Sequence, residues 1–260
     1  MTGKPEARSV SVVIPAYNEE ARIASSLDRV VPYLESRERP FEVLVVDDGS
    51  SDGTAGRAQN HPGPGVKVLR LPENRGKGAA VKTGVLASSQ ELVLICDADL
   101  STPIEELGRL IPWIDQAPIV IASRQAEGAR VERTLGRRFA SWVFNATLTA
   151  LRLCPGLRDT QCGFKLLEGD VARFLFARME IDGFAFDIEL LELARHYGIE
   201  VREVGVVWRD SSESAVRFLR DTPRMLADAW SLKRRISALP APSPSEAPRA
   251  GQRRPSADSR

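Results

Sequence analysis

The chain has 260 residues, of which 43% are hydrophobic and 27% are charged. This length fits one large domain or two small ones, and the composition excludes collagen-like, coiled-coil and wholly disordered chains. Lys and Arg number 36 against 35 Asp and Glu, so the net charge of +1 creates no overall field that would attract nucleic acid or an anionic membrane. We therefore expect no nucleic-acid partner, and any anionic ligand must bind at a local site.

Apolar, β-branched runs alternate with helical patterns through the first half of the chain. This alternation predicts a doubly wound, mainly parallel sheet flanked by helices, with a ligand crevice at the carboxyl ends of the strands. After Arg124 the pattern changes to a long helical segment at about 133–153, a Pro-Gly loop and mixed short segments. The predicted strands are Val10–Pro15, Phe41–Asp47, Val66–Leu71, Glu91–Asp97 and Ile119–Ser123.

The last part of the sequence predicts a basic amphipathic helix at 215–236, interrupted near Pro223. From about Ala238 the sequence is rich in Pro, Ser, Ala and Arg, which is typical of disorder. We therefore predict a flexible N-terminus at 1–8, a single domain at 9–236 and a disordered tail at 237–260.

The cysteines and the apolar runs of the sequence indicate where in the cell the protein is expected. Cys96, Cys154 and Cys162 lack the close pair spacing of a zinc site, and no apolar signal peptide opens the sequence. We therefore expect a cytoplasmic location. The longest mainly apolar run, 139–151, falls well short of the roughly 20 residues that span a bilayer.

The strongest candidate site is Asp97-Ala98-Asp99, directly after an apolar strand. Residues two apart in an extended segment point the same way, so both carboxylates can converge on one divalent cation, for which Mg²⁺ or Mn²⁺ fits better than Zn²⁺. Such a metal would neutralise a departing diphosphate. Because D-x-D is also frequent by chance, solvated surface aspartates are an equal alternative.

Two other strand ends carry candidate ligand groups. Asp47-Asp48 runs into a tight turn, and one of these carboxylates can reach the crevice and accept a hydrogen bond from a nucleobase. The segment Asn-Arg-Gly-Lys-Gly at 74–78 opens a helical pattern and places N–H groups beside Arg75 and Lys77, which favours phosphate. Its glycine spacing matches neither the dinucleotide fingerprint nor the P-loop.

The segment Asp-Thr-Gln-Cys-Gly-Phe-Lys at 159–165 places an acid, an amide, a thiol and a base after a Pro-Gly loop. We interpret it as the wall of a site. Cys162 has no neighbouring histidine, because His61 and His196 lie elsewhere in the chain, so the pattern does not favour Cys–His nucleophilic catalysis.

Together these motifs resemble those of the family-2 glycosyltransferases of GT-A fold, over about 10–236. Within that family they are similar to the dolichyl-phosphate β-glucosyltransferases and their prokaryotic relatives. The strings V-V-D-D-G-S-S-D-G-T and D-A-D mark the family in general. The strings D-T-Q-C-G-F-K at 159–165 and F-A-F-D-I-E-L-L at 184–191 are more specific to the polyprenyl-phosphate branch. The resemblance implies an α/β fold of GT-A type, with a mixed, mostly parallel sheet and C-terminal amphipathic helices.

The resemblance also implies inverting transfer of glucose from UDP-glucose to a polyprenyl (dolichyl-type) phosphate. A lipid phosphate is already ionised near neutral pH, so positioning and charge neutralisation would carry most of the rate. Arg124 and Asp159 would be catalytic, with Asp159 orienting the acceptor or Lys165, or acting as a base. Asp97 and Asp99 would hold Mg²⁺ or Mn²⁺. The implied donor-binding residues are Pro15, Tyr17, Glu19, Asp48, Lys77, Asp97, Ala98 and Asp99, and the implied acceptor-binding residues are Arg137, Arg138 and Arg209.

Members of this branch often carry membrane helices, whereas no run of span length occurs in this sequence. We therefore expect a peripheral contact with the inner face of the membrane. The helical segments at 133–153 and 215–236 are the candidates for it, with packing on the sheet as an equal alternative.

Other interpretations remain open. The same motifs fit a mannosyltransferase that uses GDP-mannose, or a glycosyltransferase with a soluble acceptor. A haloacid-dehalogenase-type phosphotransferase has a similar D-x-D spacing, but its motif should follow the first strand. A non-catalytic nucleotide-sugar-binding module would bind UDP without turnover, and the acidic pair argues against it.

Overall fold

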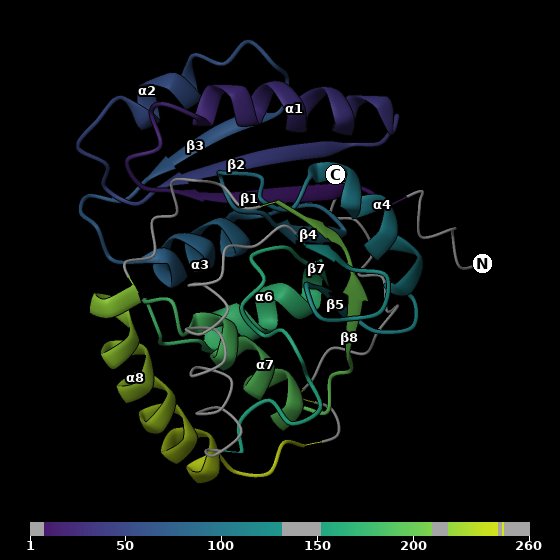
Figure 1. Cartoon of the computed structure of the whole chain (residues 1–260), viewed down its shortest axis with the longest axis vertical. Helices are drawn as coiled ribbons and strands as arrows, with labels where there is room; N and C mark the ends of the chain where they lie inside the picture. Colours follow the sequence, from purple (N-terminus) through teal and green to yellow (C-terminus); the bar gives the residue numbers. More distant parts are fainter. Residues whose placement is uncertain (1–7, 132–151, 210–217, 244–245, 247–260) are drawn as a thin grey trace, which may run out of the picture.

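The computed structural model describes residues 8–131, 152–209, 218–243 and 246 (Figure 1). Arg137, Arg138 and the predicted helix at 133–153 lie outside the described residues. The strands are β1 Val10–Ala16, β2 Phe41–Asp47, β3 Val66–Arg70, β4 Leu92–Ile95, β5 Ile119–Ser123, β6 Arg130–Val131, β7 Lys165–Glu168, β8 Val201–Gly205 and β9 Val207–Trp208. The helices are α1 Ile23–Ser36, α2 Thr54–Gln59, α3 Lys77–Ala87, α4 Leu107–Leu110, α6 Gly169–Arg178, α7 Phe186–His196 and α8 Phe218–Ala238, with 3₁₀ turns η2 Ile104–Glu106 and η3 Ile111–Trp113.

Seven strands form one sheet in the order β3-β2-β1-β4-β7-β5-β8, and β6 pairs with β9 in a separate parallel ladder. Within the large sheet only β7 runs antiparallel to its neighbours. The five predicted strands are confirmed, and so is the mixed, mostly parallel sheet. β7 and β8 were not predicted, because charged residues interrupt their short apolar pattern.

The antiparallel strand β7 determines where the site is built. Its first residue, Lys165, pairs with Ile95, the last residue of β4. Because the strands run in opposite directions, the segment before β7 and the segment after β4 emerge at the same edge of the sheet. The topology thus places segment 159–165 beside Asp97-Ala98-Asp99.

Helices cover both faces of the sheet (Figure 1). On one face, strand residues such as Val13 and Ile95 pack with α3, α6, α7 and α8. On the other face, residues such as Val12 and Ile14 pack with α1 and α4. Burial of both faces is expected for a mainly parallel sheet. A ligand therefore has access at the carboxyl ends of the strands.

The C-terminal helix α8 is continuous through Pro223, contrary to the predicted interruption, and it reaches Ala238, two residues into the predicted tail. Proline removes one backbone hydrogen bond, and packing of the helix against the core offsets that loss. Ala229, Leu232 and Ile236 are buried there. In the part of the chain that the structure describes, no helix combines the length and apolarity needed to cross a bilayer.

Candidate active site

The D-x-D motif forms a tight turn at the carboxyl end of β4. The backbone N–H of Leu100 donates to the carbonyl of Asp97 at 3.1 Å, and Leu100 adopts a φ of +48°. The backbone N–H of Ser101 donates to Oδ1 of Asp99 at 2.9 Å. Ala98 is buried, and its carbonyl accepts a 2.6 Å hydrogen bond from the Ser26 hydroxyl of α1. These contacts fix the backbone of the turn between α1 and the sheet.

Lys77, the first residue of α3, reaches this turn. Its Nζ lies 2.5 Å from Oδ1 of Asp97. Burial disfavours the charged form of Lys77, but Asp97 and Asp187 outweigh burial and raise its pKa above the ordinary lysine value. The ammonium group therefore stays charged across the neutral range. The structure thus brings together Lys77 and Asp97, two of the residues predicted to bind the donor.

Asp48, at the end of β2, holds the loop that leads into α3. Its Oδ1 accepts the backbone N–H of Arg75, and its Oδ2 accepts that of Gly76, both at 2.9 Å. Burial raises the pKa of Asp48, although the two N–H groups lower it. Gly76 has a φ of +115°, and a Cβ there would meet the carbonyl oxygen of Asp182 at 2.5 Å. Asp48 thus has an anchoring role that sequence reasoning missed.

The chain after β1 contributes the residues predicted to line the nucleoside pocket. Pro15 pairs with β2 inside the sheet, whereas Tyr17 is 43% exposed beyond the strand end. Glu19 is buried, and its carboxylate pairs with the guanidinium of Arg22. Burial and then the negative charges of the D-x-D aspartates raise the pKa of Glu19, while Arg22 lowers it. Glu19 therefore lies within the electrostatic reach of the D-x-D turn.

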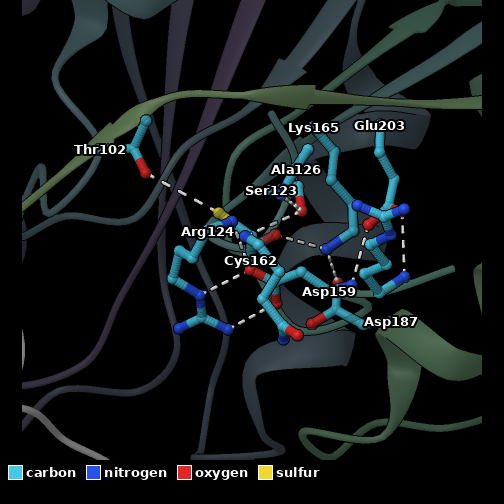
Figure 2. A network of polar contacts seen from close by, with 11 residues as sticks. Thr102, Ser123, Arg124, Ala126, Asp159, Cys162, Lys165, Asp187 and Glu203 are labelled. Atoms are coloured by element: carbon cyan, nitrogen blue, oxygen red, sulfur yellow. Dashed lines mark hydrogen bonds and ion pairs between the residues drawn. The ribbon is translucent and has the colours of Figure 1, made fainter. Parts of the chain in front are cut away.

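Arg124, immediately after β5, is clamped by Asp159 (Figure 2). Its Nε and Nη2 donate to the two carboxylate oxygens at 2.7 and 2.6 Å, and its backbone N–H donates at 2.8 Å. Asp159 is 2% exposed, and its own backbone N–H donates to Glu203 of β8 at 2.8 Å. Burial raises the pKa of Asp159, but Arg124 offsets this and holds it below the ordinary aspartate value.

This geometry bears on the role expected for Asp159. A carboxylate that is held by a bidentate arginine and has a lowered pKa is a weak proton acceptor. Its partner is Arg124, and Lys165 pairs elsewhere. The geometry therefore favours Asp159 as a residue that positions Arg124, because Lys165 pairs with Asp187 and the base role is disfavoured. Orientation of the acceptor by Asp159 stays a prediction. Glu203, which holds Asp159 in turn, carries no local sequence signal.

Lys165 and Asp187 form a buried ion pair below the site (Figure 2). Nζ of Lys165 donates to Oδ1 of Asp187 at 2.6 Å and to the carbonyl of Cys162 at 2.5 Å, and both side chains are almost fully buried. Burial raises the pKa of Asp187, whereas Lys165 and Lys77 lower it. The site thus contains a series of side chains whose charges alternate in sign. We call this series the charge chain: Asp97, Lys77, Asp187 and Lys165.

Gly163 packs directly on the D-x-D turn. A Cβ at this position would lie 2.0 Å from Oδ2 of Asp97 and 2.4 Å from its Cγ, so any other residue would displace the carboxylate. The neighbouring Cys162 is buried, and burial raises the pKa of its thiol. A protonated, buried thiol agrees with the rejection of cysteine nucleophilic catalysis. The specificity of the string at 159–165 was the one sequence signal that pointed to Gly163.

Arg209 is the described member of the predicted acceptor group. Its backbone N–H donates to the carbonyl of Ser101 at 2.8 Å, and its side chain is exposed. This contact places Arg209 at the rim of the D-x-D turn, more than a hundred residues away in sequence. The guanidinium of Arg124 lies 5.6 Å from the ring centroid of the adjacent Trp208, within range of a cation–π contact. Two arginines therefore lie near the rim.

The oxygen ligands at the D-x-D turn bear on the predicted metal. Among the described residues, no group of three or more His, Cys, Asp or Glu could form a protein cage for an ion. Mg²⁺ and Mn²⁺, however, are often held by one or two carboxylates together with substrate phosphates. The oxygen-only pair Asp97 and Asp99 fits a hard divalent cation shared with a phosphate ligand, and it fits Zn²⁺ poorly.

The known proteins that are similar to this chain in sequence are glycosyltransferases. The model of glycosyl transferase family 2 matches residues 11–176. A dolichyl-phosphate β-glucosyltransferase of Trichomonas vaginalis is 41% identical, over 79% of this chain and 65% of its own length. The enzyme of that name from Mus musculus is 36% identical over 87% of this chain and 78% of its own length, and the one from Homo sapiens is 35% identical over 78% and 68%.

Solved structures agree on the fold. Glucosyl-3-phosphoglycerate synthase from Mycobacterium tuberculosis, crystallised with Mn²⁺, UDP and glucosyl-3-phosphoglycerate, matches with a TM-score of 0.68 at 23% identity, covering 90% of this chain and 81% of that chain. This match confirms the GT-A fold, and with the D-x-D motif after β4 it removes the dehalogenase-type alternative. The chain therefore belongs to glycosyl transferase family 2, on the branch of the dolichyl-phosphate β-glucosyltransferases.

Proposed function

We propose that this protein transfers glucose from UDP-glucose to a polyprenyl phosphate of the dolichyl type, with inversion at the anomeric carbon and with the help of Mg²⁺ or Mn²⁺. The observation that carries the proposal is the convergence of the D-x-D turn, Lys77 and the Gly163 segment at one sheet edge. Family membership supports the reaction class. The names of the relatives support the donor sugar and the acceptor.

The donor is assigned to the first half of the chain. Pro15, Tyr17, Glu19 and Asp48 would line the nucleoside pocket, and Ala98 would bring its backbone close to the ribose. Each Asp48 oxygen keeps a second lone pair beyond the loop N–H that it accepts, so it can still accept a hydrogen bond from the base. The loop that Asp48 holds leads into α3, whose N-terminal N–H groups favour a phosphate.

The charged groups of the turn suit a departing diphosphate. Asp97 and Asp99 would hold the metal ion, which when bound neutralises the charge that develops on the diphosphate. Lys77 adds a positive charge from the protein beside Asp97. Because these charges act at a fixed place, they favour departure of the leaving group without rearrangement during the reaction.

The acceptor is assigned to the second half of the site. Arg124, held in a fixed orientation by Asp159, and Arg209, at the rim, would bind the lipid phosphate; Arg137 and Arg138 are proposed to help. An oxygen of this phosphate would attack the anomeric carbon, the bond from that carbon to the diphosphate would break, and UDP would leave with the electron pair. The attacking oxygen is already ionised, so the step needs no protein base.

A polyprenyl acceptor requires contact with a membrane, and we assign that contact to α8. Trp230 is 57% exposed, and the guanidinium of Arg234 lies 5.1 Å from its ring centroid. Between 227 and 238, α8 carries one acid, the half-buried Asp228, against three basic residues at 233–235. A tryptophan flanked by basic residues suits the interface of an anionic bilayer. Three buried, free cysteines support the cytoplasmic face.

A transfer assay tests the reaction. Labelled UDP-glucose and labelled GDP-mannose are incubated in parallel with polyprenyl phosphate in detergent, with Mn²⁺, Mg²⁺ or EDTA, and lipid-linked label is extracted into organic solvent. We expect metal-dependent label from UDP-glucose alone. Label only from GDP-mannose would indicate the mannosyltransferase alternative. UDP release with a soluble acceptor only would overturn the acceptor assignment, and UDP binding without turnover would indicate a binding module.

Vesicle sedimentation tests the membrane contact separately. We expect Trp230→Ala to weaken binding to vesicles that contain anionic phospholipid. Leu86→Ala is the matched control, because Leu86 is a comparably exposed apolar side chain on α3. Equal binding of the two variants would contradict the assignment of α8.

A further inference from the structure

Both carboxylate oxygens of Asp97 have a close neighbour, although the side chain is 35% exposed. Lys77 contacts Oδ1 with its Nζ at 2.5 Å. On the other side the backbone of Gly163 lies so close that a Cβ there would approach Oδ2 to 2.0 Å. A cation that binds at Oδ1 of Asp97 therefore takes the position that Lys77 holds, and the ammonium on its flexible stem can move away, whereas the backbone of Gly163 cannot.

Lys77 has a second electrostatic partner that can keep it in the site. Asp187 lies close enough to influence Lys77, and it is itself held by Lys165. Lys77 is also the first residue of α3, and its side chain is 20% exposed. An ammonium displaced from Asp97 thus remains within the influence of the Asp187 carboxylate.

We propose that Lys77 occupies the cation position at Asp97 in the free protein, and that it moves to the diphosphate when the nucleotide sugar and a divalent metal bind together. The inference rests on the proposed function for the identity of the diphosphate. It adds a role for Lys77 in metal binding: Lys77 lowers the affinity of the site for a divalent cation when no nucleotide is bound.

The physical reason is charge balance. Without nucleotide, the positive charge of Lys77 neutralises Asp97 and repels an approaching divalent cation. A bound diphosphate brings new negative charge, which attracts Lys77 away and completes the oxygen ligands of the metal. Because coupling between two ligands is reciprocal, UDP must raise the affinity for the metal by the same factor as the metal raises the affinity for UDP.

Electron paramagnetic resonance of free Mn²⁺ measures this coupling directly. The protein is titrated with Mn²⁺ alone and with Mn²⁺ plus saturating UDP. We expect the wild type to bind Mn²⁺ at least about tenfold more tightly with UDP than without it. Lys77→Met keeps the unbranched stem of the side chain, one atom shorter, and removes its charge. We expect this variant to bind Mn²⁺ alone about tenfold more tightly than the wild type and to gain much less from UDP.

Two variants serve as controls. Arg75→Met removes a cation from the same loop, but that cation pairs with Asp182, so we expect the affinity for Mn²⁺ alone to stay at the wild-type value. Lys77→Arg keeps the positive charge, and we expect it to restore weak binding of Mn²⁺ alone. Thermal melting of each variant establishes that it is folded.

The outcomes separate this inference from the proposed function. If the wild type binds Mn²⁺ equally well with and without UDP, the exchange of Lys77 is wrong, while the metal-dependent transfer can stand. The same conclusion follows if Lys77→Met leaves the affinity for Mn²⁺ alone unchanged. If Mn²⁺ does not bind even with UDP, the metal assignment of the proposed function fails as well. If Lys77→Met does not fold, an equal affinity of the wild type for Mn²⁺ with and without UDP still overturns the exchange, and Lys77→Gln takes the place of the methionine variant.

Discussion

The two halves of the site hold their functional groups in different ways. Between β1 and the D-x-D turn, hydrogen bonds to the backbone set the geometry: Asp48 accepts two loop N–H groups, and Asp99 accepts one from Ser101. Between β5 and α7, ion pairs of side chains far apart in sequence do so, namely Arg124 with Asp159 and Lys165 with Asp187. We therefore expect the second half to depend more strongly on each charged partner.

The largest expected effect tests the first half. Asp99→Asn keeps the shape of the side chain but removes a metal-ligand charge, and we expect the rate of transfer to fall by about a thousandfold, in line with a loss of several kcal/mol of transition-state stabilisation. The fold should persist, because the backbone geometry of the turn remains. Asp170→Asn, which alters a surface carboxylate paired with Arg173, is the matched control. Activity within tenfold of the wild type would contradict the metal assignment.

The second prediction concerns the buried ion pair of Lys165 and Asp187 in the second half of the site. Lys165→Met leaves Asp187 as an uncompensated buried charge, and we expect the free energy of unfolding to fall by about 3–5 kcal/mol. Urea denaturation measures the loss. The double variant Lys165→Met with Asp187→Leu should recover much of it, because both charges are then gone. A single variant as stable as the wild type would show that the pair does not organise this half.

The third prediction uses pH. Because the pKa of Asp159 is lowered in the folded protein, its ionised form stabilises the fold above its unfolded pKa of about 3.9, and this stabilisation is lost as the pH falls through the folded pKa. We expect Asp159→Asn to be less stable by about 1–3 kcal/mol at neutral pH. The stability of the variant should also fall less than that of the wild type below pH 4. If the free energy of unfolding falls equally in the wild type and the variant below pH 4, Asp159 does not stabilise the fold through its ion pair with Arg124.

The smallest expected effect lies at the contact between the halves. Gly163→Ala must push the Asp97 carboxylate aside, and we expect the affinity for UDP with Mn²⁺ to fall by about tenfold. Gly56→Ala is the matched control, because a Cβ at Gly56 would meet nothing within 4 Å. Calorimetric titration compares the two. Equal affinities would mean that Asp97 can shift without consequence for the donor.

The same contrast explains what the sequence could predict. The candidate groups of the donor half, which lies between β1 and the D-x-D turn, were predictable because they follow apolar strands: Asp48 comes directly after β2, and Asp97 and Asp99 come shortly after β4. The turn at Asp99 and the helix start at Lys77 are local features, whereas the contacts of Asp48 with the loop at 75–76 span 27 and 28 residues and were missed. The acceptor half depends on partners 22, 35 and 44 residues apart, in the pairs Lys165–Asp187, Arg124–Asp159 and Asp159–Glu203. No periodicity joins such residues.

The unpredicted strands have a physical reason as well. β7 is four residues long and begins and ends with Lys165 and Glu168, and β8 carries Arg202 and Glu203 between its valines. Short charged segments of this kind do not resemble buried strands until the register of their neighbours is known. The segments 159–165 and 184–191 both belong to the pattern that is specific to this branch of the family. This shared membership was the one indication in the sequence that Lys165 and Asp187 are in contact.

One measurement tests the division of the site most directly: the affinity for UDP with Mn²⁺ and the KM for polyprenyl phosphate, determined for Asp48→Asn and Arg209→Gln in parallel. The division predicts that Asp48→Asn weakens UDP binding by about tenfold and leaves the KM for the lipid within about twofold, and that Arg209→Gln does the reverse. If both variants weaken the same ligand, the two halves do not bind separate substrates, and the account of the site is wrong.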